Sequence, residues 1–168
     1  RQHENDREAT AADLKWLADP AEEPEPFGDG GTKMAWNTFN VVSIYPNGNP
    51  VMSDVNQRWV GDCCACAVIA SMAYLYPRFV KHIIKDNMDK TYTVTMYDPK
   101  GKQISVGVGG DYFIGNSGDL GALGGRNKEV TWATILEKAM IKWNQIYQGS
   151  SNVGGIGTEY VSAIFTGD

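Results

Sequence analysis

The sequence predicts an α+β domain, because separate segments carry clear and different secondary-structure patterns. Residues 63–76 are rich in Ala and Ser at helical spacing, which indicates a helix packed closely against its neighbours. Residues 91–108 alternate polar and apolar side chains on both sides of a turn at 98–101, a pattern typical of a β-hairpin. Residues 130–147 place apolar side chains at i, i+3, i+4 and i+7, which predicts a long amphipathic helix. We expect a short helix or turn over 158–168.

Length and composition fit one globular domain preceded by a polar arm. The chain has 168 residues and 42% apolar content, enough to bury one core. Residues 1–33 are rich in charge, Pro and Gly, and we expect an N-terminal arm or linker there, with the domain over 34–168. A partly ordered tail is the expected state of the arm. The alternative is docking of its short helical stretch through Leu14, Trp16 and Leu17.

Charge and hydropathy exclude two classes of partner. The net charge of -5 supplies no basic patch for nucleic acid. No apolar run approaches the roughly 18 residues of a membrane-spanning helix, and the N-terminus lacks the apolar core of a signal peptide. Because the chain begins at Arg1 rather than Met, we expect a processed or trimmed product, and the N-terminus does not predict the compartment.

All three cysteines, Cys63, Cys64 and Cys66, lie within four residues. Their odd number and close spacing make a poor disulfide framework, because short local bridges strain the bond geometry. A zinc site would need a second pair of ligands, and the histidines, His3 and His82, do not supply one. Intrachain disulfides and structural zinc are therefore not expected.

Cys63 stands where the predicted helix begins. Asp62 is a plausible N-cap, Gly61 permits the turn before it, and Pro77 ends the run. A cysteine at this position faces unpaired backbone N–H groups and the positive end of the helix dipole, which favour the thiolate. Such a thiolate can act as a nucleophile. On position alone, the alternative is that all three cysteines are packed in the core.

Two motifs of the chain match a known pattern. The segment QRWVGDC, residues 57–63, followed by ACAVIASMAYLYP, resembles Q-G-x-x-G-D-C-W and its small-residue helix. The segment TWATILEKAMIK, then a Gly-Gly loop and FTGD, resembles W-S-x-L-L-E-K-A-Y-A-K, a Gly-Gly loop and F-T-G-G. These are the motifs of the calpain-like cysteine proteases, and the chain resembles that family in their order over residues from about 45 to 168. The resemblance implies the first lobe of a papain-like fold, with a central Cys-bearing helix, a β-hairpin and a long second helix.

The resemblance also implies roles for individual residues. Cys63 matches the nucleophile of an endopeptidase that acts on protein or peptide substrates. Gln57 matches the oxyanion-hole glutamine, whose amide and the Cys63 N–H would stabilise the tetrahedral intermediate. Gly154 and Gly155 match the loop along which these enzymes pair the substrate backbone.

The chain departs from the family pattern in three ways. Arg58 replaces the glycine after the glutamine, and Cys64 replaces the tryptophan after the nucleophile. In papain-like enzymes the His and Asn lie about 130 to 150 residues beyond the cysteine, which is past Asp168, and His82 lacks the family's context. The second, β-rich lobe is thus absent from this chain.

Two interpretations follow for the absent catalytic residues. The resemblance implies that a companion chain or a missing C-terminal part supplies His and Asn, and we expect a bacterial, exported enzyme whose chains stay associated after proteolytic self-processing. The alternative is a catalytically inactive binding or regulatory module, which Arg58 and Cys64 would support.

Calcium is the cofactor that the resemblance implies. The family's site in this lobe uses loop carbonyls before the cysteine motif together with carboxylates, the hard oxygen ligands that Ca²⁺ requires. The matching positions are Asn47, Gly48, Asn49, Asp54 and Glu129, of which Asp54 keeps the family's spacing to the cysteine. The alternative is that Asp54 is a turn residue and Glu129 a helix-start residue.

Overall fold

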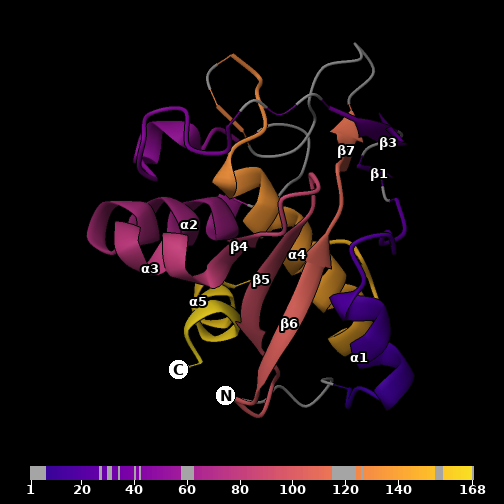
Figure 1. The fold of residues 1–168 in the computed structure, drawn as a ribbon. Helices are drawn as coiled ribbons and strands as arrows, with labels where there is room; N and C mark the ends of the chain where they lie inside the picture. Colours follow the sequence, from indigo (N-terminus) through magenta and orange to yellow (C-terminus); the bar gives the residue numbers. More distant parts are fainter. Residues whose placement is uncertain are drawn as a thin grey trace.

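The computed structural model has the predicted α+β class (Figure 1). The residues that it describes are 7–26, 28–29, 32–33, 35–39, 41, 43–57, 63–114, 124–125, 127–153 and 157–167. Within these ranges the chain forms five α-helices, one 3₁₀ turn and small antiparallel sheets. No helix in the described part is long and apolar enough to cross a membrane.

The predicted hairpin forms the centre of the largest sheet. Strands β5 (Tyr92–Tyr97) and β6 (Gln103–Val108) pair in antiparallel register, from Tyr92 opposite Val108 to Tyr97 opposite Gln103. A third strand, β4 (Ile84–Asp86), pairs with β5, giving the order β4-β5-β6. The alternation of the sequence places Tyr92, Val94 and Met96 in the core, as the pattern predicts.

Short strands outside the hairpin were not predicted. β3 (Ala35–Thr38) pairs antiparallel with β7 (Asp111–Ile114), and the Trp36 ring stacks on Phe113 with 4.0 Å between ring centroids. β1 (Gly28–Asp29) and β2 (Thr32–Lys33) form a further pair. These strands are two to four residues long, which is too short for their alternation to stand out in the sequence.

The cysteine-bearing helix α2 (Cys63–Leu75) begins at Cys63, as predicted. It ends two residues before Pro77, which is the first residue of a separate helix, α3 (Pro77–Ile83). Proline suits that place because its fixed φ matches the first helical turn and its missing N–H has no partner to lose there. Pro77 therefore both ends one helix and starts the next. The predicted cap residues Gly61 and Asp62 lie outside the described residues.

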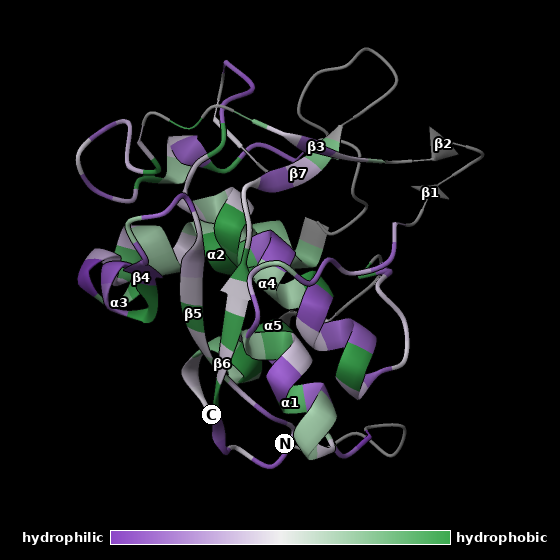
Figure 2. Ribbon diagram, turned by 45° about the vertical axis from the view of Figure 1, so that its right-hand side comes forward, coloured by the Kyte–Doolittle hydropathy of each residue, from purple (hydrophilic) through white to green (hydrophobic). Residues whose placement is uncertain are grey.

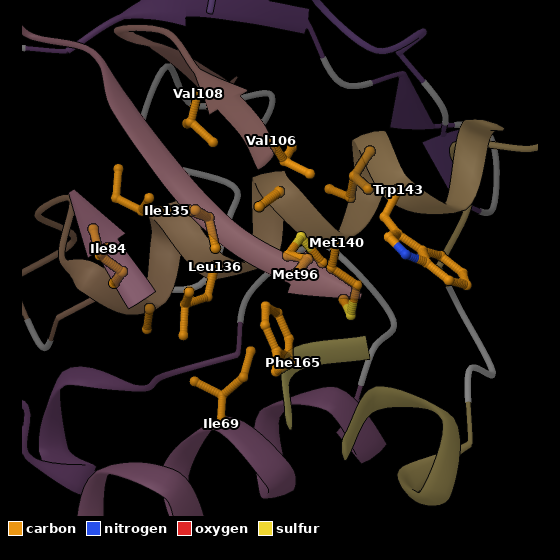
Figure 3. Close-up of a cluster of buried hydrophobic side chains, with 14 of the residues drawn as sticks. Ile69, Ile84, Met96, Val106, Val108, Ile135, Leu136, Met140, Trp143 and Phe165 are labelled. Carbon is orange, nitrogen blue, oxygen red and sulfur yellow. The ribbon is translucent and has the colours of Figure 1, made fainter. Parts of the chain in front are cut away.

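The long helix α4 (Trp132–Tyr147) is buried along almost its whole length. The Thr131 hydroxyl caps its start by accepting a hydrogen bond from the Ala133 N–H at 3.2 Å. Helix α5 (Thr158–Thr166) packs against α2 and β5 and ends at Gly167, whose φ of +85° suits a glycine C-cap. The core lies between the sheet and these helices (Figure 3) and includes Ile69, Met96, Val106, Ile135, Leu136, Met140 and Phe165.

The N-terminal arm carries a docked helix, α1 (Ala11–Ala18), rather than a partly ordered tail. A capping box starts it: the Asp13 N–H donates to the Thr10 hydroxyl at 3.1 Å, and the Thr10 N–H donates to the Asp13 carboxylate at 2.9 Å. Leu17 is fully buried, and α1 packs against β6 and α4 (Figure 2). The approach is close, because a Cβ on Gly107 would lie 2.5 Å from the Ala18 carbonyl oxygen.

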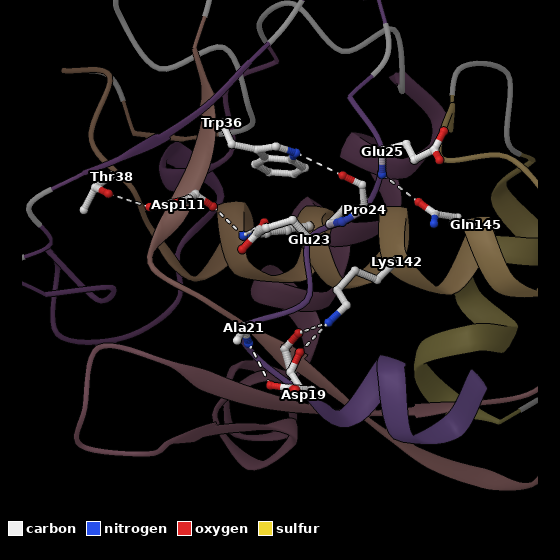
Figure 4. Close-up of polar contacts among 12 residues, drawn as sticks. Asp19, Ala21, Glu23, Pro24, Glu25, Trp36, Thr38, Asp111, Lys142 and Gln145 are labelled. Carbon is white, nitrogen blue, oxygen red and sulfur yellow. Dashed lines mark hydrogen bonds and ion pairs between the residues drawn. The ribbon is translucent and has the colours of Figure 1, made fainter. Parts of the chain in front are cut away.

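Lys142 on α4 binds the arm from the interior. Its ammonium donates to the carbonyl oxygen of Asp19 at 2.9 Å (Figure 4). It also donates to the carbonyl oxygen of Gly107 at 2.8 Å and reaches that of Trp16 at 3.5 Å. The side chain is fully buried. One cation thus joins the end of α1 to strand β6, and its hydrogen bonds compensate part of the cost of burying the charge.

Two more residues of the same α4 face, Lys138 and Gln145, hold the segment after α1. Lys138 lies one helical turn before Lys142, with its ammonium 2.6 Å from a Glu23 carboxylate oxygen. The Lys138 ammonium also lies 4.5 Å from the centroid of the Trp36 ring and makes a cation–π contact with it. The Gln145 side-chain oxygen accepts from the Glu25 N–H at 2.7 Å. Residues 16–25 therefore form a layer bound directly to the central helix.

The buried lysine gives the fold a defined pH dependence. Burial, followed by the neighbouring Lys138, lowers the pKa of Lys142 from 10.5 to about 8, while nearby carboxylates oppose the shift. Between these two pH values the unfolded chain binds more protons at this lysine than the folded chain does, so Lys142 should raise the free energy of unfolding as the pH rises from about 8. Near pH 10 the half-buried Tyr45 and the buried Tyr112 and Tyr147 begin to oppose this rise, because burial raises their pKa values from 10.0 and the unfolded chain loses their protons first. Urea titrations should show a contribution of up to about 3 kcal/mol from this group.

A pair of variants isolates this contribution. The methionine of Lys142→Met cannot titrate, so the free energy of unfolding should rise less with pH in this variant than in the wild-type protein. Lys85→Met, which changes an exposed lysine of β4, should keep the wild-type profile. An unchanged profile in Lys142→Met would contradict the assignment.

Candidate functional site

The start of α2 and the segment before it form the candidate active site. Cys63 is the first residue of α2, and Gln57, which precedes it in the chain, is exposed. Asn56, next to Gln57, is fixed by a β-bridge: its N–H donates to the Gly124 carbonyl at 3.0 Å, and its side-chain amide donates to the same oxygen at 3.0 Å. The Cys63 side chain and residues 58–62 lie outside the described part.

Helix α2 is held in place by its small and apolar residues. Ala65, Ile69, Met72 and Ala73 are buried, spaced so that they share one side of the helix. The helix packs against α5, α3, α4 and the 3₁₀ turn η1 (Met52–Asp54). Cys64 and Cys66 are half-buried. The Ala-rich surface thus fixes the direction in which the N-terminus of α2 points.

Asp54 connects the loop before Gln57 to the start of α4. It is only 2% exposed, and its carboxylate accepts from the Asn47 side-chain amide at 2.9 Å, the Val51 N–H at 3.2 Å and the Trp132 indole N–H at 2.8 Å. Its backbone oxygen accepts from the Thr131 hydroxyl at 3.2 Å. Asp54 therefore has a structural role, one of the two that the sequence allowed: it joins the loop to the start of α4.

The proposed calcium positions are brought together only in part. Asn47 contacts Asp54 through its side chain, whereas Gly48 lies in an exposed turn with φ of +83° and Asn49 is exposed. The Glu129 side chain lies over Gly125, since a Cβ at that position would clash with the Glu129 carboxylate. Within the described residues, no three His, Cys, Asp or Glu side chains gather as a metal group.

Glu129 nevertheless has a feature that suits a cation. One of its carboxylate oxygens is buried and has no hydrogen-bond partner among the described residues. A buried carboxylate oxygen without a donor is costly. A metal ion is one way to satisfy it. Glu129 lies two residues before Thr131, which contacts the Asp54 backbone, so the two carboxylates belong to the same region of the fold.

Asn144 is a candidate positioning residue that the sequence did not reveal. Its side-chain amide donates to the carbonyl oxygens of Ser150 at 2.8 Å and Asn152 at 3.2 Å. It thereby holds the loop that leads to Gly154 and Gly155, which themselves lie outside the described residues. Nothing in the helical pattern of α4 distinguishes this asparagine from a solvent-facing polar residue.

No protein-family model matches the chain, and a search of curated proteins finds no relative. The resemblance to calpain-like proteases therefore stays a prediction that depends on the two motifs and on the position of Cys63.

Proposed function

We propose that this chain is the nucleophile-bearing first lobe of a calpain-like cysteine endopeptidase with papain-like architecture. The observation that carries the proposal is the position of Cys63 at the first residue of α2, a few residues after the exposed Gln57. A thiol at a helix N-terminus faces unpaired N–H groups and the positive end of the dipole, which stabilise its thiolate. The β-bridge at Asn56 holds the residue before Gln57, and the packing of α2 holds the helix that begins at Cys63.

In the proposed reaction the Cys63 thiolate attacks the carbonyl carbon of a peptide bond. A carbon–sulfur bond forms, and the π electrons move to the carbonyl oxygen. The Gln57 side-chain amide and the Cys63 N–H donate hydrogen bonds to that oxyanion. When the intermediate collapses, the carbon–nitrogen bond breaks and the amine leaves with a proton from an imidazolium, the form that an imidazole takes when it accepts the Cys63 thiol proton. Water then hydrolyses the thioester, releasing the acid and regenerating the thiol.

We propose that the imidazole comes from a companion lobe. His82 is exposed in the last turn of α3, and no other histidine belongs to the described residues. We propose that a second chain, or a C-terminal continuation, supplies the histidine and the asparagine that orients it, after proteolytic processing. A catalytically inactive module, the alternative that Arg58 and Cys64 favour, would need no such partner.

Labelling with an epoxysuccinyl inhibitor of thiol proteases tests this function. In the presence of the companion lobe, mass spectrometry should find the adduct on Cys63, and Cys63→Ser should abolish both labelling and peptide hydrolysis. Gln57→Ala should lower kcat by about 10²- to 10³-fold, because one oxyanion donor is lost.

Cys66→Ser provides the matched control, since this half-buried thiol lies further along the same helix, and its activity should stay near wild type. Inertness of Cys63 with the companion lobe present would support the inactive module and exclude the endopeptidase.

We also propose that Ca²⁺ binds this lobe. Glu129 would hold it through its buried oxygen, with Asp54 and loop carbonyls of Asn47, Gly48 or Asn49 as further candidates. The ion would supply positive charge that fixes the loop before Gln57 against the start of α4, and it would take no part in bond breaking.

Thermal unfolding tests the calcium site without depending on activity. Ca²⁺ at about 100 times its Kd should raise the Tm by roughly 8 °C over the value in chelator. Glu129→Gln should remove this shift, whereas Glu25→Gln, at an exposed carboxylate, should keep it. Equal Tm values in calcium and in chelator would remove calcium from the proposal.

A further inference from the structure

An exposed apolar cluster lies at the C-terminal end of α2, where the chain turns into α3. Tyr74, Leu75 and Tyr76 follow one another in the sequence and are 73%, 58% and 62% exposed. Met52 of η1, 50% exposed, lines a hollow together with Ser71, Tyr74 and Leu75. We call Met52, Tyr74, Leu75 and Tyr76 the apolar tip. Three consecutive exposed apolar residues are unusual on a domain surface that binds nothing.

The side chains of the apolar tip point in different directions. Tyr74 and Leu75 are successive residues of α2, so their side chains are rotated about 100° from one another around the helix. Tyr76 leaves the helical conformation, with φ of −139° and ψ of 58°, and begins the turn into α3. A flat partner surface would cover one of these directions. The fluid interfacial layer of a bilayer can surround all of them.

Cations border the apolar tip on the side of α3. Arg78 and Lys81 are exposed and lie three residues apart, which places them on the same side of α3. Lys85 follows on β4 and is also exposed. We call these three residues the basic rim. Residues 63–85 contain no Asp or Glu, although the chain as a whole has a net charge of -5.

The first carboxylates after this segment are engaged in their own turn. Asp86 accepts from the Met88 N–H at 2.8 Å, and Asp89 accepts from the Thr91 N–H at 3.1 Å. None of the three cations of the basic rim forms an ion pair within the described residues. The rim therefore presents positive charge on a protein that is otherwise acidic. An anionic surface would attract this side of the molecule and repel the rest.

The same charges disfavour a second copy of this chain as the occupant. In a two-fold symmetric contact the same surface patch meets itself, so the basic rims of the two copies would lie close together and repel each other. An anionic bilayer matches both features of the patch. Its interfacial layer accepts apolar side chains, and its headgroups attract lysine and arginine.

We propose that the apolar tip and the basic rim bind the surface of an anionic bilayer. Met52 and Leu75 enter the boundary between headgroups and acyl chains, and the cations pair with lipid phosphates. Tyr74 and Tyr76 lie at headgroup level, where a ring with one polar end is favoured. The protein lies on the bilayer without spanning it. The site is independent of the peptidase proposal, since Cys63 is about 18 Å away at the other end of α2.

Vesicle co-sedimentation tests the proposal, using the protein with any chain that accompanies it. Vesicles of equal parts phosphatidylglycerol and phosphatidylcholine should bind at least tenfold tighter than vesicles of phosphatidylcholine alone. Binding should weaken as the salt concentration rises, because salt screens the attraction between the rim and the headgroups. The vesicles should slow hydrogen exchange over residues 74–82 more than over α1, which lies on the opposite side of the molecule (Figure 1).

Two double variants separate the apolar and the charged parts of the patch. Tyr74→Ser with Leu75→Ser should weaken binding to the anionic vesicles at least tenfold, because less apolar surface enters the bilayer. Arg78→Gln with Lys85→Gln should also weaken it at least tenfold, since each cation near an anionic surface strengthens binding by about fivefold. All four side chains are exposed, so both variants should keep the wild-type Tm.

A third double variant is the matched control. Lys15→Gln with Lys102→Gln removes two exposed cations outside the patch and should bind the anionic vesicles as the wild type does. The proposal is overturned if the anionic vesicles do not bind at millimolar lipid, if neutral vesicles bind equally well, or if the control loses as much binding as Arg78→Gln with Lys85→Gln. Self-association that Tyr74→Ser with Leu75→Ser abolishes would assign the patch to a second copy and also overturn it.

Discussion

The burial of helix α4 is the constraint on which the rest of the structure depends. A helix surrounded on nearly all sides must find partners for every polar group that it carries into the interior. Its Lys142 finds three backbone carbonyls, two on the arm and one on β6. Lys138 finds Glu23. The arm is consequently part of the fold, because without it Lys142 would lose two of its three acceptors and Lys138 would lose its carboxylate partner.

The start of the same helix organises the region before the candidate nucleophile. The Trp132 indole donates to Asp54, whose carboxylate also gathers Asn47 and Val51. This hydrogen-bonded cluster ties the loop over 45–56 to α4 just before the chain reaches Gln57. Helix α2 then packs on the core through Ala65 and Ile69. The two segments that flank the proposed oxyanion hole are thus anchored to one helix.

Local patterns predicted those parts of the fold whose signal is contained in a single segment. The alternation from Tyr92 to Val108 gave the hairpin, and the start of α2 at Cys63 followed from its position after a turn. The pairing of β3 with β7 joins residues more than seventy positions apart, and no periodicity reports such a contact. The helical pattern likewise does not reveal that Lys138 and Lys142 are buried, because the arm that covers them is more than a hundred residues away in the sequence.

The candidate site remains a prediction. The motif over residues 57–63 offered Gln57 and Cys63 as its residues, and the same resemblance offered Asp54 two roles without deciding between them. The hydrogen bonds of Asp54 and the two that Asn144 donates to the loop over 150–152 depend on tertiary packing, which the sequence does not encode locally. The unpartnered oxygen of Glu129 likewise becomes visible only when the fold buries it.

The central claim is that the helix start makes the Cys63 sulfur a reactive thiolate. The most direct measurement is the rate of iodoacetamide alkylation at each cysteine as a function of pH, followed by mass spectrometry on the protein with any chain that accompanies it. The account predicts rapid alkylation of Cys63 well below the pKa of about 8.5 of an ordinary thiol, with Cys64 and Cys66 slow throughout. Alkylation of Cys63 that rises only near that ordinary pKa, or no faster than at Cys64, would contradict it.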